Sequence, residues 1–184
     1  MNRGVGVLAG LGLLALAFLV TFTSPTEDQT QAPFAVTGAV GEQVVSDHLV
    51  MTVHEVILAR EAEVGSWVGT TSGLWLAVDV TAEGRVERTS LGASVYIDGV
   101  RYPASSRPDT IDGTVVDAAL PRSGPLLFEL PADIADQPGA RDAVVRIGAG
   151  LDMRLDSVID VHVDLTTLEA QERVALDEPR DGRR

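Results

Sequence analysis

The sequence predicts an all-β protein, an antiparallel β-sandwich preceded by one N-terminal transmembrane helix. Two observations lead to this expectation. From Val36 onward, short runs of alternating apolar and polar residues recur between turn residues, and no long amphipathic helix interrupts them. Before them, residues 4–23 form one uncharged run of mainly apolar residues. Short strands separated by turns are typical of β-sandwiches, and about 20 apolar residues span the core of a bilayer.

The flanks of the apolar run are those of a membrane anchor. Arg3 precedes the run, and Glu27 and Asp28 follow it. The positive-inside rule then places the N-terminus in the cytoplasm and the rest of the chain outside the cell, as a single-pass protein of the cell membrane. A cleaved signal peptide is the alternative, but its apolar region is usually only about 7–15 residues long. We therefore expect residues 1–24 to be an uncleaved transmembrane signal anchor.

Within this run, Gly6 and Gly10 have the spacing of a GxxxG pair. Small residues at this spacing let two membrane helices approach closely, so the two glycines are a candidate helix-dimer contact. Glycine is also common in membrane helices in general, and both interpretations stay open.

Composition divides the remaining chain into three parts. Residues 25–35 are rich in Thr, Gln, Pro and acidic residues, which is typical of a flexible spacer. Residues 36–168 carry the strand pattern of the sandwich. Residues 169–184 are charged and end in Arg-Asp-Gly-Arg-Arg, which predicts a disordered tail.

The sandwich is organised around the run Leu74–Thr81. Because side chains alternate across a strand, Leu76, Val78 and Val80 share one apolar face and form the centre of the expected core, while Trp75 lies on the other face. In an earlier strand, the set of residues expected to face the core shifts by one position at His54-Glu55, which predicts a β-bulge. Residues 59–73 appear polar and are expected to form a loop that contains Trp67.

A tight hairpin follows the central strand. Asp98-Gly99 is the dipeptide of a two-residue type I′ turn, since both positions need positive φ. This turn pairs Ile97 with Val100, and Tyr96 with Arg101. It places Val95, Ile97, Val100 and Tyr102 on one face, in agreement with the hydrophobic pattern.

Three segments together resemble a known family. The segments are Gly73–Thr81, Tyr96–Tyr102 with its Asp-Gly turn, and Pro125–Pro131. In this order they resemble a bacterial immunoglobulin-like "domain of unknown function" family, whose members are secreted or membrane-anchored. The resemblance implies an immunoglobulin-like sandwich over roughly residues 36–165. It implies no catalytic residues, because the family has none that are agreed.

Charge and composition exclude several classes of function. The net charge is −13, and all 27 acidic residues lie after residue 25, so a nucleic-acid partner is not expected. The chain has no cysteine, which excludes disulfides, thiolate catalysis and cysteine zinc sites. No Gly-x-Ser-x-Gly motif or phosphate loop is present. We expect no enzyme activity, no catalytic residue and no cofactor.

Two sets of residues are candidates for binding. Asp160, His162 and Asp164 alternate on one strand face and could hold a divalent ion, but a solvated face opposite an apolar one is the ordinary pattern of an antiparallel strand. We therefore expect no metal there. Trp67 is the second candidate, because an aromatic residue on a loop can anchor a protein partner. Closing one end of the sandwich core is an equally good role for this tryptophan.

These observations favour a non-enzymatic extracytoplasmic interaction module that is tethered to the membrane by its helix and binds an unknown protein partner. An accessory subunit of a membrane transport or secretion complex is the first alternative. A metal-dependent enzyme is the second. Neither the partner nor the oligomeric state is determined by the sequence.

Overall fold

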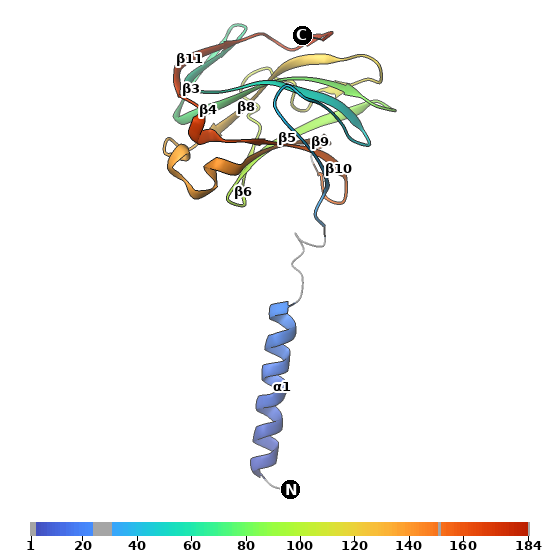
Figure 1. Ribbon diagram of the computed structural model, residues 1–184, viewed down its shortest axis with the longest axis vertical. Helices are drawn as coiled ribbons and strands as arrows, with labels where there is room; N and C mark the ends of the chain where they lie inside the picture. Colours follow the sequence, from blue (N-terminus) through green and yellow to red (C-terminus); the bar gives the residue numbers. More distant parts are fainter. Residues whose placement is uncertain (1–2, 24–30, 151, 184) are drawn as a thin grey trace. The chain divides into compact units, whose positions relative to one another are not determined.

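The computed structural model describes residues 3–23, 31–150 and 152–183 (Figure 1). The chain divides into two compact units, of which the first ends at Ala32 and the second runs from Pro33 to Arg184. The sandwich therefore begins three residues earlier than the predicted boundary at Val36. The predicted spacer falls mostly on residues 24–30, which lie outside the described residues.

The described part of the first unit is helix α1, Arg3–Thr23. Its position agrees with the predicted apolar run. Across residues 3–23, 31–150 and 152–183, however, no helix combines the length and hydropathy needed to cross a membrane. The structure thus does not support the transmembrane helix predicted at residues 4–23.

The second unit is a β-sandwich of two sheets, which we name sheet A and sheet B (Figure 1). In the described residues each sheet has six strands. Sheet A follows the order β1 (Phe34–Gly38), β10 (Ser157–Val163), β9 (Ala143–Ala149), β5 (Thr89–Ile97) and β6 (Val100–Pro103), with β7 (Val115–Val116) on β5. Sheet B follows the order β11 (Gln171–Leu176), β3 (Leu49–Val64), β4 (Trp67–Gly84), β8 (Arg122–Leu130) and β12 (Arg180–Asp181), with β2 (Gln43–Val45) on β3.

Most neighbouring strands are antiparallel, while the pairs β1/β10 and β11/β3 are parallel. The described residues also form three short 3₁₀ helices: η1 (Ile134–Asp136) and η2 (Pro138–Asp142) connect β8 of sheet B to β9 of sheet A, and η3 (Leu165–Thr167) follows β10. The predicted β-sandwich is confirmed at the level of two facing β-sheets.

The core between the sheets confirms the predicted phase of the central strand. Leu76, Val78 and Val80 of β4 are each 1% exposed or less and belong to the main buried cluster. From the facing sheet, Ile159 and Val161 of β10 join the same cluster. The alternation of β4 therefore sets which face of sheet B meets sheet A.

Two local predictions are also confirmed. The β3/β4 register shifts between Val53 and Glu55, as expected for a bulge at His54-Glu55. The hairpin turn has positive φ at Asp98 (49°) and Gly99 (76°), and Ile97 pairs with Val100. The inward face of this hairpin is incomplete, because Val100 is 52% exposed.

The loop predicted at residues 59–73 is wrong. Strands β3 and β4 continue through this region and pair as far as Val64 and Trp67. A two-residue turn joins them, and Gly65 has φ 56° at its first position, where type II′ hairpins take glycine. Alternating charges on the exposed side of these strands, such as Glu61 and Glu63, give the segment its polar composition.

The disordered tail predicted at residues 169–184 is also wrong. Residues 171–176 form β11, which extends sheet B beside β3, and residues 180–181 form β12 beside β8. The reason is an apolar alternation hidden among charges: Val174 is 5% exposed and packs with Trp75 and Ala77. We call residues 171–183 the C-terminal segment.

We predict that Val78→Asp prevents stable folding of the second unit. Val78 is fully buried between the sheets, and an unpaired buried carboxylate costs several kcal/mol out of the roughly 5–15 kcal/mol that stabilise a domain. Circular dichroism should show loss of the cooperative melting transition. The exposed residue Val86 provides the control, because Val86→Asp should melt like the wild type. An unchanged melting temperature for Val78→Asp would contradict the buried position of this side chain.

Candidate functional site

The outer face of sheet B, which points away from sheet A, carries a second apolar cluster. Its centre is Trp75, which is fully buried although it points away from the main core. The indole N–H of Trp75 donates to the Gly69 carbonyl at 3.0 Å. The ring of Trp67 packs edge-to-face on Trp75, with ring centroids 5.7 Å apart. The guanidinium of Arg107 lies 5.4 Å from the centroid of Trp75 and 5.8 Å from that of Trp67.

Trp67, the candidate partner residue, is therefore not on a free loop. It is half-buried at the start of β4, and it closes the outer cluster rather than one end of the main core. A Cβ added at Gly69 would meet the Trp67 ring, so the lack of a side chain there makes room for the indole. Whether Trp67 also binds a partner stays a prediction.

A groove lies on the same outer face, between β3, β4, β8 and the C-terminal segment. Its volume is about 230 Å³. Glu55 of β3 and Asp79 of β4 are directly opposite each other in the strand register, and both line the groove. Ile57 and Leu176 add apolar surface, and Glu178 adds a further carboxylate. The groove thus combines an apolar surface with excess negative charge. The groove is not evident from the sequence, because the charged composition of residues 169–184 predicts a disordered tail rather than one wall of a groove.

Beside this groove, a chain of hydrogen bonds crosses three strands. His54 Nε2 lies 2.7 Å from Thr81 Oγ1, which lies 2.7 Å from Ser123 Oγ. Ser123 Oγ in turn donates to the Gly182 carbonyl at 2.8 Å. Since the carbonyl can only accept, the Ser123 proton points to Gly182, Thr81 donates to Ser123, and His54 donates through Nε2–H.

The direction of this chain determines its chemistry. A histidine that activates a serine must accept a proton from it, whereas here His54 is the donor at the start of the chain. Ser123 and Thr81 are buried, and the terminal acceptor belongs to the C-terminal segment. The chain therefore attaches that segment to sheet B and does not prepare a nucleophile.

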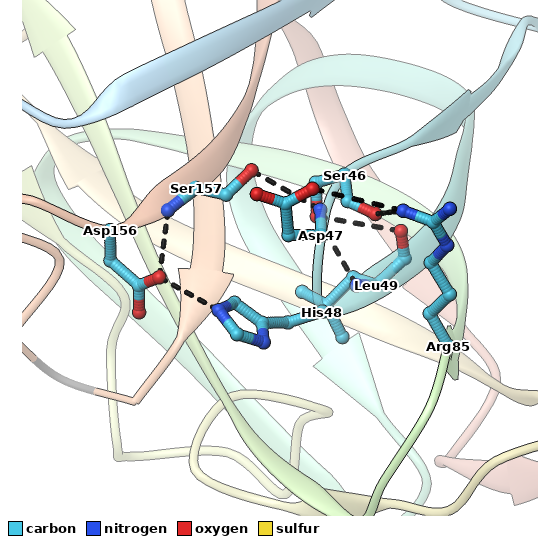
Figure 2. Close-up of polar contacts among 7 residues, drawn as sticks. All are labelled: Ser46, Asp47, His48, Leu49, Arg85, Asp156 and Ser157. Atoms are coloured by element: carbon cyan, nitrogen blue, oxygen red, sulfur yellow. Dashed lines mark hydrogen bonds and ion pairs between the residues drawn. The ribbon is translucent and has the colours of Figure 1, made fainter.

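A second polar cluster joins the turn between β2 and β3 to the start of β10 (Figure 2). His48 Nε2 lies 2.9 Å from Asp156 Oδ1, which also accepts from the Ser157 N–H at 2.7 Å. The Ser157 hydroxyl accepts from the Asp47 N–H at 3.2 Å.

The cluster contains Ser, His and Asp, the residue types of a hydrolytic triad, but the contacts differ. In a triad the histidine bonds to the serine hydroxyl, whereas here the Ser157 hydroxyl caps the backbone of Asp47. Arg85 completes the cluster by donating to the Ser46 carbonyl at 3.0 Å (Figure 2). The contacts of His48 and Asp47 in this cluster hold the β2/β3 turn against β10 of sheet A.

The three residues considered for metal binding, two on β10 and Asp164 directly after it, have separate partners. Asp160 accepts two hydrogen bonds from Arg146, both at 2.7 Å. His162 Nδ1 lies 2.5 Å from Asp142 Oδ1, and Asp164 accepts from the Thr166 N–H at 2.9 Å at the start of η3. No three His, Asp or Glu side chains in the described ranges converge as metal ligands would.

The expectation of a fully solvated β10 face is wrong for Asp160. This residue is 6% exposed, because Arg146 covers it from the neighbouring strand β9. The pairing with Asp160 raises the pKa of Arg146 above its ordinary value. The Arg146 guanidinium also lies 4.8 Å from the ring centroid of Tyr96. Arg101, which pairs with Tyr96 in the hairpin as predicted, donates to Ser94 Oγ at 2.8 Å.

Gly6 and Gly10, the candidate helix-dimer pair, both lie in α1. A Cβ built at Gly10 would meet nothing within 4 Å. Contact with a second helix at this position stays a prediction.

Comparison with known proteins gives distant structural similarity only. No family model and no curated protein matches the chain. Among solved structures, the chain is similar to an uncharacterised β-sandwich protein from Clostridium difficile 630, with a TM-score of 0.46 and 11% identity, covering 74% of this chain and 99% of that one. It is also similar to MPT63, a secreted protein from Mycobacterium tuberculosis, with a TM-score of 0.44 and 15% identity, covering 69% of this chain and 98% of that one. Both similarities are too distant to bear on the site.

We predict that Asp160→Ala lowers the free energy of unfolding by about 2–3 kcal/mol, because it leaves the largely buried Arg146 guanidinium without its carboxylate. His162→Ala is the matched control on the same strand face. Its ion pair with Asp142 is exposed, so the expected change is below about 0.5 kcal/mol. Urea unfolding of both variants measures the difference. Equal stability of the two variants would show that the Arg146 pair contributes no more than a surface pair.

We predict that Asp112→Asn stabilises the protein at neutral pH. Burial raises the pKa of Asp112 above its ordinary 3.8, opposed in part by a hydrogen bond from the Ala93 N–H and by the charge of Arg101. Because the folded state then holds the proton more tightly than the unfolded chain, stability falls as the pH rises from the ordinary pKa through the raised one. An amide oxygen at this position can still accept from Ala93.

The measurement is the urea midpoint of wild type and variant from about pH 3 to about pH 7. The advantage of Asp112→Asn should be present at the upper end and should disappear near the lower end. The exposed Asp109→Asn is the control for loss of one negative charge. A variant that is less stable than the wild type at neutral pH would show that the ionised carboxylate is favoured by its surroundings.

Proposed function

We propose that the protein is a non-enzymatic extracytoplasmic interaction module, tethered to the cell membrane, that binds a protein partner in the groove on the outer face of sheet B. The groove itself is the observation that carries this proposal. Its volume of about 230 Å³ is below the roughly 300–1,000 Å³ of small-molecule sites. A single side chain of a partner protein fits a cavity of this size better than a whole substrate.

The chemistry of the groove supports a basic partner segment. Glu55 and Asp79 stand directly opposite each other and bring two carboxylates to the groove. A lysine or arginine side chain of the partner would pair with these carboxylates, while its aliphatic part would lie against Ile57 and Leu176. The net charge of −13 would also attract a basic partner from a distance.

The state of the histidines supports a non-enzymatic role. His48, His54 and His162 are each held by a side chain of the protein itself. His54 links β3 to β4, His162 links β10 to η2, and His48 links the β2/β3 turn to the turn before β10, so each contact has a structural role. We further propose that the sandwich belongs to the immunoglobulin-like family that its strand segments resemble.

The tether in this proposal rests on the sequence of residues 4–23, which carries no charge. Cell fractionation followed by mass spectrometry tests it. Recovery in the membrane fraction, with peptides that begin before Ser24, is the expected result. A mature N-terminus near Thr26 and recovery from the medium would contradict the tether and would leave the groove proposal standing.

We predict that Glu55→Gln with Asp79→Asn reduces partner capture without reducing stability. The matched control is Glu87→Gln with Asp109→Asn, which removes the same charge from exposed positions outside the groove. Partners are captured by crosslinking on intact cells and are quantified by mass spectrometry. We expect the groove variant to capture at least about fivefold less of a specific partner than the wild type, which corresponds to the loss of one or two charged hydrogen bonds. Equal capture by both variants would contradict the groove as the binding surface.

A further inference from the structure

Strand β1 leaves one edge of sheet A open. It pairs with β10 in parallel, with Phe34 opposite Ser157, and the Phe34 N–H donates to the Asp156 carbonyl at 2.8 Å. In a parallel ladder the backbone groups of alternate residues point to the same side. Phe34, Val36 and Gly38 therefore face β10, while the N–H and C=O groups of Ala35 and Thr37 point away from the sheet. Within residues 31–150 and 152–183, no hydrogen bond to these four groups is found.

This edge lacks the features that normally protect a strand from pairing with another chain. Natural edge strands carry charges, proline or a bulge, or are covered by another segment. Residues 34–38 contain none of the three sequence features, and residues 33–41 have no charged side chain. Phe34 and Val36 are 68% and 37% exposed on the face that they share with the buried core.

The other sheet edges differ from β1. The end of β6 is bridged to sheet B through Ala104 and Phe128. On sheet B, β11 carries Glu172 and Arg173, and β12 consists of Arg180 and Asp181. The remaining edge strands, β2 and β7, are uncharged but only three and two residues long, so β1, with five residues, is the longest uncharged edge strand in the described chain.

We propose that β1 pairs with β1 of a second copy of this chain, antiparallel about a two-fold axis at Val36, so that the two A sheets form one continuous sheet. In this register Ala35 lies opposite Thr37 of the second copy. These are the residues whose backbone groups point outward, and the two symmetric pairs form four hydrogen bonds. The register therefore satisfies every open backbone group of residues 35 and 37.

The side chains are self-complementary in the same register. Phe34 lies opposite Gly38 of the second copy, so the largest side chain of the strand meets the residue without one. A side chain at Gly38 would collide with Val44, which fills this position, and Phe34 of the other copy would pack on Val44. Val36 meets its own equivalent at the axis. This self-complementary pattern of side chains favours a second copy of the chain as the occupant, and the lack of charge in residues 33–41 avoids local repulsion between two chains of net charge −13 at the contact.

This interface is separate from the proposed partner groove, which lies on sheet B. A symmetric dimer has the same patch on both copies, so a single substitution changes the contact twice. The absence of cysteine from the chain allows a direct test with single cysteines.

The test compares Val36→Cys with Phe34→Cys in the full chain, purified in mild detergent and oxidised. Val36 and its equivalent form a non-hydrogen-bonded pair with Cα atoms about 4.5 Å apart, within disulfide range. The two Phe34 residues lie about four residues apart along the strands, roughly 14 Å. Although Phe34 is the more exposed, we expect Val36→Cys to crosslink at least about tenfold faster, since only its pair is within bonding distance.

Val86→Cys, 77% exposed in the turn between β4 and β5, gives the rate of random collision. Val36→Cys crosslinking no faster than Val86→Cys would overturn the proposal, as would faster crosslinking of Phe34→Cys. Gly6→Leu with Gly10→Leu in the Val36→Cys background distinguishes association through helix α1 from association through strand β1. An unchanged rate is expected, and loss of the crosslink would overturn the proposal by assigning the association to α1.

A second variant leaves the fold intact. The Thr37 N–H points away from β10, so Thr37→Pro removes two intermolecular hydrogen bonds per dimer and none within the sheet. Sedimentation equilibrium should show a dimer dissociation constant at least about tenfold higher than that of the wild type, with an unchanged melting curve. A monomeric wild type at about 100 μM, or a Thr37→Pro chain that dimerises like the wild type, would overturn the proposal. The groove variant Glu55→Gln with Asp79→Asn should dimerise normally, which separates this proposal from that of the partner groove.

Discussion

Strand β4 is apolar on both faces, and the rest of the second unit depends on this constraint. Leu76 and Val78 point into the core between the sheets, while Trp75 and Ala77 point to the opposite side. A sheet with two apolar faces must be covered twice, and sheet A can cover only one face. The outer face is covered by the far end of the β3/β4 hairpin and by the C-terminal segment, whose Val174 packs with Trp75.

The C-terminal segment therefore creates the groove as well as the cover. It crosses the outer face of sheet B and leaves a space where Glu55 and Asp79 prevent apolar contact. The chain from His54 to the Gly182 carbonyl fixes the end of the segment, with every proton directed toward it. His54, Thr81 and Ser123 thus connect the C-terminal segment to three strands of sheet B. In a similar way, His48 and Asp156 join the β2/β3 turn to the start of β10 (Figure 2).

The two surfaces proposed here for binding differ in their chemistry. The outer face of sheet B presents an acidic groove, and the β1 edge of sheet A presents open backbone groups without charge. These two surfaces differ in the partners that they suit: a basic side chain in the groove, and a second uncharged strand at the edge. Because they lie on different sheets, one copy can use both at once.

Alternation by itself determined the class of fold and its central strand. The period of two in Leu74–Thr81, the phase change at His54-Glu55 and the Asp-Gly turn are local signals, since side-chain direction and turn geometry depend on neighbouring residues. The structure confirms all three.

Tertiary structure alone decided which polar segments are ordered. Residues 59–73 look like a loop because polar, charged and glycine residues outnumber the apolar ones, and residues 169–184 look like a tail because charged residues alone outnumber the apolar ones. Both segments become strands that contribute to the apolar cluster around Trp75 on the outer face of sheet B. For residues 169–184 this apolar surface belongs to a strand far away along the chain. The same reason explains Asp160, whose exposure depends on Arg146 of the next strand rather than on its own strand pattern. Local pattern gives the direction of a side chain, and only the assembled sheets decide what lies over it.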